Sequence, residues 1–151
     1  HLVRGERNLP SILEQATGFG TRWLMAQRYV PEVRQGDKRI LLLEGELLGA
    51  VLRVPSESEV RANLHVGGRA AEAEIGDAEI RIVERIAPLL RREGLFFVGI
   101  DVIGGRLTEI NVTSPTGLQE ANALGGLCLE TRVIERVEQR VRALTGPRSA
   151  G

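Results

Sequence analysis

The alternation of apolar and polar residues along the chain predicts two β-hairpins. The first pairs a strand at 38–43 with a strand at 47–54 across a turn at 44–46. The second lies within residues 99–116 and is bounded by turn residues on both sides. Because the strands come as hairpins rather than as repeated βαβ units, we expect an α+β fold with a mainly antiparallel sheet.

Helical periodicity appears in three other places. A short helix is expected at 8–17, a longer one at 77–93 and a C-terminal one at about 127–144. Pro88 predicts a kink or an irregular turn within the second helix. Asn8 is the expected N-cap of the first helix. The positions expected to face the core are Ile80, Val83, Ile86, Ala87 and Leu90 in the second helix and Val133, Ile134, Val137, Val141 and Leu144 in the third.

The remaining segments complete the expected organisation. Residues 23–30 read as a further strand that ends at Pro31. Residues 55–73 lose all periodicity, which is typical of a loop that is either functional or disordered. Residues 1–145 are expected to belong to one domain, and residues 146–151 to form a flexible tail.

Three oxygen-bearing side chains interrupt the apolar pattern of the second hairpin. Side chains alternate along a strand, so Glu109 and Asn111 share one face. A three-residue loop at 104–106 would set Asp101 across from Glu109, whereas a two-residue loop would pair Asp101 with Thr108. We favour the longer loop, which leaves the other face wholly apolar. It would also pair Ile100 with Ile110 and Val98 with Val112.

The opposed carboxylates of Asp101 and Glu109 indicate a cation site. Like charges directly across a ladder are destabilising unless a cation lies between them. A ligand set made only of oxygens favours Mg²⁺ or Mn²⁺ over zinc. The alternative is a hairpin whose acidic face is solvated and binds nothing.

Composition excludes several partners. Basic and acidic residues balance at 20 each and aromatic residues are 3%, so neither a nucleic acid nor an acidic membrane surface is an expected partner. No apolar run approaches membrane-spanning length. The single cysteine, Cys128, excludes an intrachain disulfide and fits a cytoplasmic protein.

Arginines cluster near the first hairpin. Cross-strand pairing brings Arg39 and Arg53 toward the same end of the sheet, and Arg61 follows in the loop. Guanidinium groups bind carboxylates and phosphates in a bidentate manner, so their place near the cation site indicates an anionic substrate that binds beside a nucleotide. The alternative is that these arginines are exposed charges at strand ends.

The chain resembles the bacterial glutathione synthetases, which are ATP-grasp ligases. The resemblance covers nearly the whole chain in order and spacing, and it implies that residues 1–145 are the C-terminal part of an ATP-grasp domain. The motifs that carry it are Asp-Lys-Arg at 37–39, Leu-Arg-Val-Pro at 52–55, Arg61-Ala-Asn63, Gly67-Gly68-Arg69 and the whole run 99–116.

The resemblance implies a role for each matching residue. Mg²⁺ ions that bridge the ATP phosphates, with Mn²⁺ as a possible substitute, would be held by Asp101, Glu109 and Asn111. Arg39 and Arg53 would be catalytic. Adenine would contact the backbone of Gln27, Arg28, Tyr29 and Val30. The substrate positions would be Arg53, Arg61, Asn63, Gly67, Gly68, Ser114, Pro115, Thr116 and Gly117.

The implied reaction is the ATP-dependent joining of γ-glutamylcysteine to glycine through an acyl phosphate. Phosphate-binding lysines of the family lie in a preceding portion, and Lys38 is the sole lysine here, so we expect the isolated chain to be incomplete and inactive. A homo-oligomer, or association with an N-terminal part, is expected. The alternatives are a non-catalytic ATP-grasp remnant that acts as a binding or oligomerisation module, and a related carboxylate–amine ligase.

Overall fold

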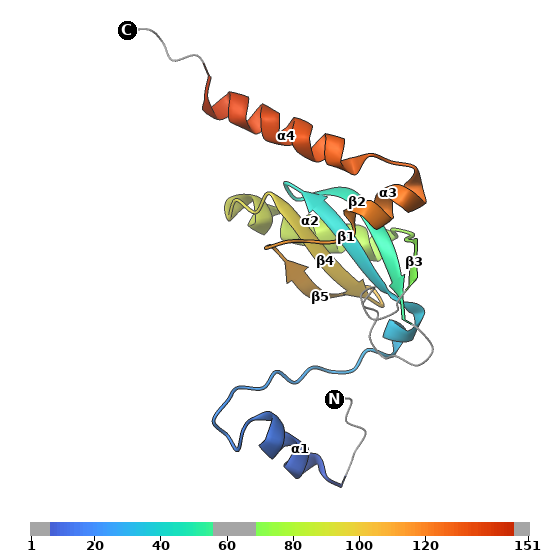
Figure 1. The fold of residues 1–151 in the computed structure, drawn as a ribbon, viewed down its shortest axis with the longest axis vertical. Coiled ribbons are helices and arrows are strands. Elements are labelled where there is room, and N and C mark those ends of the chain that lie inside the picture. Colours follow the sequence, from blue (N-terminus) through green and yellow to red (C-terminus); the bar gives the residue numbers. More distant parts are fainter. Residues whose placement is uncertain (1–6, 56–68, 147–151) are drawn as a thin grey trace. The chain divides into compact units, whose positions relative to one another are not determined.

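The structure is a computed structural model that describes residues 7–55 and 69–146. Its residues divide into two compact units, one ending at Pro31 and one beginning at Glu32, and each is described by itself. Figure 1 shows the elements of both units. Four expected substrate residues and most of the expected tail lie outside the described residues, namely Arg61, Asn63, Gly67, Gly68 and residues 147–151.

The described part of the first unit, residues 7–31, contains one helix, α1 (Leu9–Ala16), which confirms the helix predicted at 8–17. Asn8 occupies the N-cap position without a side-chain capping hydrogen bond. The predicted strand at 23–30 is wrong, because this segment has no regular secondary structure. A strand needs a neighbour to satisfy its backbone amides, and the described part of this unit offers no second strand.

The second unit is built on a five-stranded sheet in which every paired neighbour is antiparallel, as predicted. A short 3-10 helix, η1 (Pro31–Gln35), leads into it. The strand order is β3-β2-β1-β4-β5. The strands are β1 (Asp37–Leu43), β2 (Glu46–Val54), β3 (Arg69–Glu72), β4 (Phe97–Ile103) and β5 (Arg106–Asn111).

Both hairpins close with two-residue turns, so the predicted three-residue loop at 104–106 is wrong. The turns are Glu44-Gly45 and Gly104-Gly105, and all four residues have positive φ angles. This left-handed pairing matches the right-handed twist of the flanking strands. In each hairpin the third residue after the turn, Leu48 or Thr108, is an extra residue in the ladder and forms a β-bulge.

The bulge at Thr108 produces the register that the longer loop was meant to explain. Beyond the bulge, Asp101 pairs with Glu109 and Ile100 pairs with Ile110, as predicted. An extra residue in one strand shifts the ladder by one position, just as a one-residue longer loop would. The expected pairing of Val98 with Val112 lies outside the ladder, because β5 ends at Asn111.

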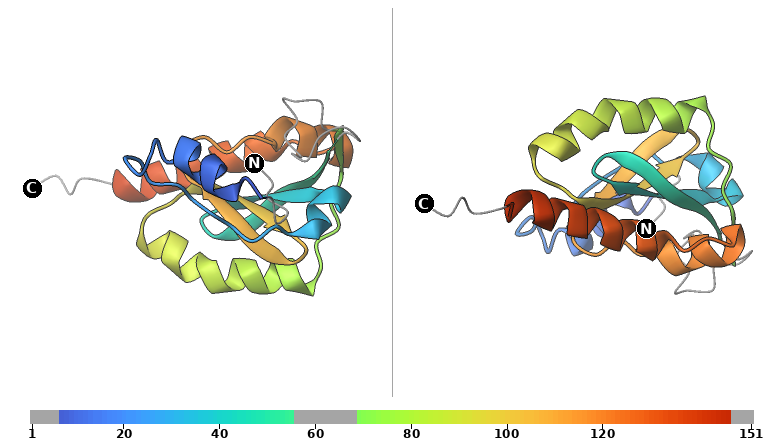
Figure 2. Two further views of the ribbon diagram at one scale, coloured as in Figure 1. Left: turned by 90° about the horizontal axis from the view of Figure 1, so that it is seen from below. Right: turned by 90° about the horizontal axis from the view of Figure 1, so that it is seen from above.

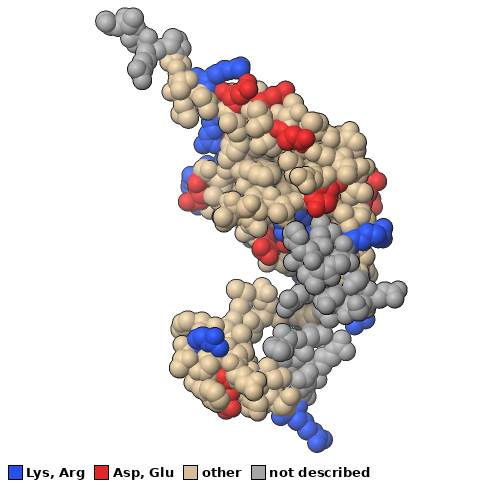
Figure 3. Space-filling view, in the orientation of Figure 1, with Lys and Arg blue, Asp and Glu red and all other residues tan. Residues whose placement is uncertain are grey.

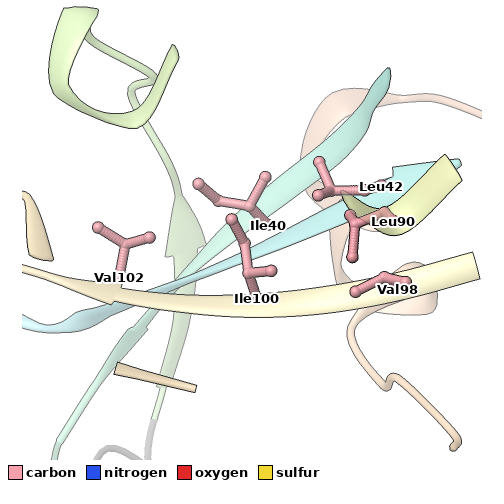
Figure 4. Close-up of a cluster of buried hydrophobic side chains, with 6 residues drawn as sticks. All are labelled: Ile40, Leu42, Leu90, Val98, Ile100 and Val102. Atoms are coloured by element: carbon pink, nitrogen blue, oxygen red, sulfur yellow. The ribbon is translucent and has the colours of Figure 1, made fainter. Parts of the chain in front are cut away.

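Helix α2 (Asp77–Arg92) covers one face of the sheet, as Figure 2 shows. The helix is continuous through Pro88, and its Glu79 carboxylate accepts a hydrogen bond from the Gly76 amide at 3.0 Å. Ala87 and Leu90 are buried as expected, whereas Ile80 is exposed. The core of this face, drawn in Figure 4, consists of Ile40, Leu42, Leu90, Val98, Ile100 and Val102.

Helices α3 (Leu118–Gly125) and α4 (Leu129–Leu144) lie on the other face (Figure 2). Helix α3 has no counterpart in the sequence predictions. The apolar cluster under the two helices consists of Leu41, Leu43, Leu48, Ala121 and Leu129.

Helix α4 turns only the start of its apolar stripe toward the core. Leu129 is its only buried residue, and Val133 packs against the apolar cluster as expected. The rest of the stripe expected to face inward is exposed, namely Ile134, Val137, Val141 and Leu144. On the same helix, Arg136 and Arg140 form ion pairs with Glu44, at 3.2 and 3.5 Å. The periodicity was therefore correct, but the prediction that the stripe faces the core holds for Val133 and is wrong for the other four residues.

The surface of α4 carries charged side chains of both signs. On the face shown in Figure 3, acidic and basic side chains are interspersed along α4. Among the described helices, none combines the length and the apolar character that crossing a membrane requires.

Candidate functional site

Four charged side chains gather where β1, β2 and β4 run side by side. Asp37 and Arg39 are two residues apart on β1 and therefore share a face. The ladder sets Arg39 opposite Asp101 of β4 and Asp37 opposite Arg53 of β2. Arg39 and Asp101 are only 5% and 6% exposed. We call these four residues the charged cluster.

Arg39 is the most fully bonded member of the charged cluster. Its Nε and Nη2 atoms donate to the two Asp101 carboxylate oxygens at 2.5 and 3.1 Å. Its Nη1 atom donates to the Thr116 carbonyl and hydroxyl oxygens at 3.2 and 3.4 Å. All three guanidinium nitrogens are engaged, so Arg39 fastens β4 to the segment that follows β5.

Two glycines make room for the Arg39 side chain. A Cβ atom at Gly99 would lie 2.8 Å from the Pro115 Cβ and 3.3 Å from the Arg39 Cδ. Gly117 has φ +114°, and a Cβ there would lie 3.1 Å from the Arg39 Cγ. The arginine stem thus lies against backbone that tolerates no larger residue without a shift.

Arg53 bridges the two carboxylates of the charged cluster. Its Nη2 atom contacts the Asp101 Oδ2 atom at 2.7 Å and also contacts Asp37 Oδ2. Two acidic and two basic groups therefore balance in charge. Among the described residues, the buried Asp37 Oδ1 and Arg53 Nε atoms have no hydrogen-bond partner.

Burial and neighbouring charges shift the pKa values of this pair. Burial raises the pKa of Asp37, and the Asp101 carboxylate raises it further, which outweighs the opposing effect of Arg53. Burial alone would lower the pKa of Arg53, but the Asp37 and Asp101 carboxylates raise it overall. Arg53 therefore remains a cation.

The predicted cation ligands lie at the β4–β5 pair. Glu109 is exposed opposite Asp101, and Asn111 is opposite Gly99 on the same face. The Asn111 side-chain oxygen also accepts a hydrogen bond from the Ser114 amide at 3.3 Å. Within the described residues, no three His, Cys, Asp or Glu side chains form a metal-binding group.

The donor set is nevertheless suitable for Mg²⁺. It consists of two carboxylates and an amide oxygen, all hard oxygen donors. The Asp101 Oδ2 atom already contacts nitrogens of both Arg39 and Arg53, whereas Oδ1 accepts only from Arg39 Nε and keeps a second acceptor site that a cation could use. Asp101 is thus the residue at which a cation and the arginines would compete.

The structure brings only part of the predicted site together. Ser114, Pro115, Thr116 and Gly117 follow β5, and three of them lie close to Gly99 or Arg39. Gln27, Arg28, Tyr29 and Val30 belong to the first unit.

Sequence reasoning missed Asp37 as a site residue. The hairpin register would have revealed it, because Asp37 pairs directly with Arg53.

The fold is of the ATP-grasp type. The chain is similar to D-alanine–D-alanine ligase from Bacillus anthracis, a structure determined in complex with ATP, with a TM-score of 0.56 at 17% sequence identity. That similarity covers 95% of this chain and 50% of the ligase chain. The family model described as prokaryotic glutathione synthetase, ATP-grasp domain, matches residues 1–126, and the chain belongs to that family.

Curated relatives agree with this assignment. The chain is 49% identical to the glutathione synthetase of Gloeobacter violaceus over 141 residues and 46% identical to that of Agrobacterium fabrum over 140 residues. It is 53% identical to the glutathione synthetase of Parasynechococcus marenigrum over 133 residues. These alignments cover 88% to 93% of this chain but only 43% to 44% of the relatives.

Proposed function

We propose that this chain forms part of an ATP-dependent ligase that joins γ-glutamylcysteine to glycine. The observation that carries the proposal is the charged cluster beside a hairpin with Asp101, Glu109 and Asn111 on one face, in a chain of this family. The chain spans less than half the length of its relatives, so we propose that residues 1–145 need further polypeptide for activity.

Asp101, Glu109 and Asn111 are the proposed ligands of Mg²⁺, or of Mn²⁺ in its place. When bound, such a cation supplies positive charge that stabilises the transferring phosphoryl group of ATP. The exposed Glu109 reaches the site from the edge strand, while the buried Asp101 is fixed by its arginines. For adenine we propose the backbone of Gln27, Arg28, Tyr29 and Val30.

Arg39 and Arg53 are the proposed catalytic cations. The γ-glutamylcysteine carboxylate attacks the γ-phosphate of ATP, ADP leaves, and the amine of glycine then displaces phosphate from the acyl phosphate. Fixed guanidinium groups stabilise the negative charge of both steps without reorganising. Arg61, Asn63, Gly67, Gly68 and residues 114–117 are proposed to line the substrate site.

The cellular location and the association of the chain are also proposed. We propose a cytoplasmic location and association through a homo-oligomer or with an N-terminal part. The exposed apolar stripe on α4 supports an association, because a contiguous apolar surface commonly marks an interface.

A chimera tests the proposed ligase activity. The matched segment of the Gloeobacter violaceus glutathione synthetase would be replaced by the corresponding residues of this chain, and glutathione formation measured with Mg²⁺ and ATP. We expect product that depends on both γ-glutamylcysteine and glycine, and loss of that product with Asp101→Asn. A folded chimera that is active only with another acyl substrate would favour a related carboxylate–amine ligase.

A further inference from the structure

Asp37 has no part in the proposed cation site, yet it contacts the same nitrogen of Arg53 as Asp101 does. The Arg53 Nη2 atom contacts Asp37 Oδ2 and lies 2.7 Å from Asp101 Oδ2. The side chains of Asp37 and Arg53 are 13% and 12% exposed. This ion pair is therefore shielded from solvent. In such a buried environment, a charge that loses its partner destabilises the protein.

The two carboxylates that contact Arg53 differ in their other contacts. Asp101 also binds two nitrogens of Arg39 and is the proposed cation ligand. Asp37 is paired with β2, and the strand order β2-β1-β4-β5 places its strand two positions from Glu109 and Asn111. A cation at the β4–β5 pair would thus bind the Asp101 carboxylate, while Asp37 would remain paired with Arg53.

We infer that Asp37 is a positioning residue, which keeps the Arg53 guanidinium in the charged cluster when the Asp101 carboxylate is engaged by a cation. Arg53 is then held in place for an anionic group of the ligand. The engagement of Asp101 by a cation and this last step both rest on the proposed function. The retention of Arg53 by Asp37 is a property of the chain itself.

The simpler explanation is that Asp37 and Arg53 form an ion pair that serves stability alone. Lys38 and Glu79 supply a matched comparison, because they form a 2.9 Å ion pair from the neighbouring position of β1 to the helix on the opposite face. The Glu79 side chain is 7% exposed. Glu79→Gln therefore disturbs a similar ion pair away from the charged cluster.

Arginine side-chain NMR on the 151-residue chain tests the inference directly. A guanidinium held by carboxylates rotates slowly and shows resolved Nη signals, whereas a released one shows averaged signals. We expect the Arg53 signals to stay resolved with saturating Mg²⁺ in the wild type and in Glu79→Gln. In Asp37→Asn they should average when Mg²⁺ is added, and Asp37→Glu should restore them. Resolved Arg53 signals in Asp37→Asn would overturn the inference if the Asp101 and Glu109 amide signals shift on adding Mg²⁺. If those amide signals do not shift, the proposed cation site fails instead, and the Asp101→Asn variants below decide the inference.

A second arm avoids dependence on the metal. Asp101→Asn removes the competing carboxylate charge permanently. Arg53 should remain resolved in that variant and become averaged in the double variant with Asp37→Asn. Averaging in Asp101→Asn alone would show that Asp37 cannot hold Arg53 and would overturn the inference.

Binding of inorganic phosphate separates the positioning role from the proposed function. Removing the negative charge of Asp37 should by itself strengthen phosphate binding, but loss of a positioned Arg53 should weaken it about tenfold. With Mg²⁺ present, we expect calorimetry to show the weakening in Asp37→Asn and not in Glu79→Gln. Unchanged or tighter binding in Asp37→Asn contradicts the inference. If neither protein binds phosphate but the Nη signals change as expected, the positioning role stands and the proposed anion-binding role of Arg53 fails.

Discussion

Replacing Arg39 by methionine removes two of the three contacts that hold the Asp101 carboxylate, those at 2.5 and 3.1 Å. Only the 2.7 Å contact with Arg53 remains, and Asp101 is 6% exposed. Removing one partner of a buried ion pair typically costs about 3–5 kcal/mol, because the other charge stays buried. We expect the lower end of that range, about 3 kcal/mol, since Arg53 still compensates part of the Asp101 charge.

Urea unfolding followed by circular dichroism measures this loss. For a chain of about 150 residues, a loss of about 3 kcal/mol in the free energy of unfolding corresponds to a fall in Tm of roughly 6–12 °C. Lys38→Met is the control on the same strand, because it breaks the ion pair with Glu79 on the opposite face. The Lys38 side chain is 28% exposed, so water can solvate part of what is lost, and its cost should be about 1 kcal/mol.

The double variant Arg39→Met/Asp101→Leu gives the coupling between the two charges. It should be less destabilised than the sum of the single variants by about 2 kcal/mol or more, because it leaves neither Arg39 nor Asp101 as an uncompensated charge. A cost for Arg39→Met that equals the cost for Lys38→Met, with additive single variants, would refute the argument that the charged cluster is a strongly coupled buried unit.

Three further variants test other parts of the structure. Gly99→Ala should destabilise the fold by about 1–3 kcal/mol in urea, because the new Cβ would lie 2.8 Å from the Pro115 Cβ; an unchanged midpoint would contradict that packing. Burial opposes ionisation of Glu79, but hydrogen bonds from Lys38 and Gly76 lower its pKa below the usual 4.5. Its stabilising contribution is therefore present above pH 4.5 and lost as the pH falls through the lowered value, so Glu79→Gln should flatten the acid limb of stability against pH; parallel curves would contradict this. Leu129→Ala should cost about 2–5 kcal/mol and the exposed Val137→Ala less than about 0.5 kcal/mol; equal costs would mean that the α4 stripe is buried.

The hairpin at the site was predictable in its register but not in its turn. The alternation around Asp101 and Glu109 favoured a register in which both side chains share a face, and the ladder pairs them. The sequence could not distinguish a three-residue loop from a two-residue turn with a bulge at Thr108, since both shift the register equally. The pattern of side chains therefore predicts which residues pair across the hairpin, but it does not predict the backbone conformation of the turn.

Other elements depended on information that a local pattern does not contain. The amphipathic spacing in α4 identified the helix, but the side that meets the sheet carries Leu129 and Val133 together with Arg136 and Arg140, which pair with Glu44. Strand β3 is four residues long and lacks alternation, so only its pairing with β2 defines it. The pairing of Asp37 with Arg53 could be read from the hairpin register, although a carboxylate near a turn carries no signal by itself.

The location of a paramagnetic cation tests the central claim most directly. Mn²⁺ added to the ¹⁵N-labelled chain broadens the amide signals nearest to it. We expect the strongest broadening at Asp101, Glu109 and Asn111, and recovery of these signals with excess Mg²⁺. Broadening centred on another acidic surface, such as Glu135 and Glu138 of α4, or signals unaffected by Mn²⁺, would contradict the assignment of this hairpin as the cation site.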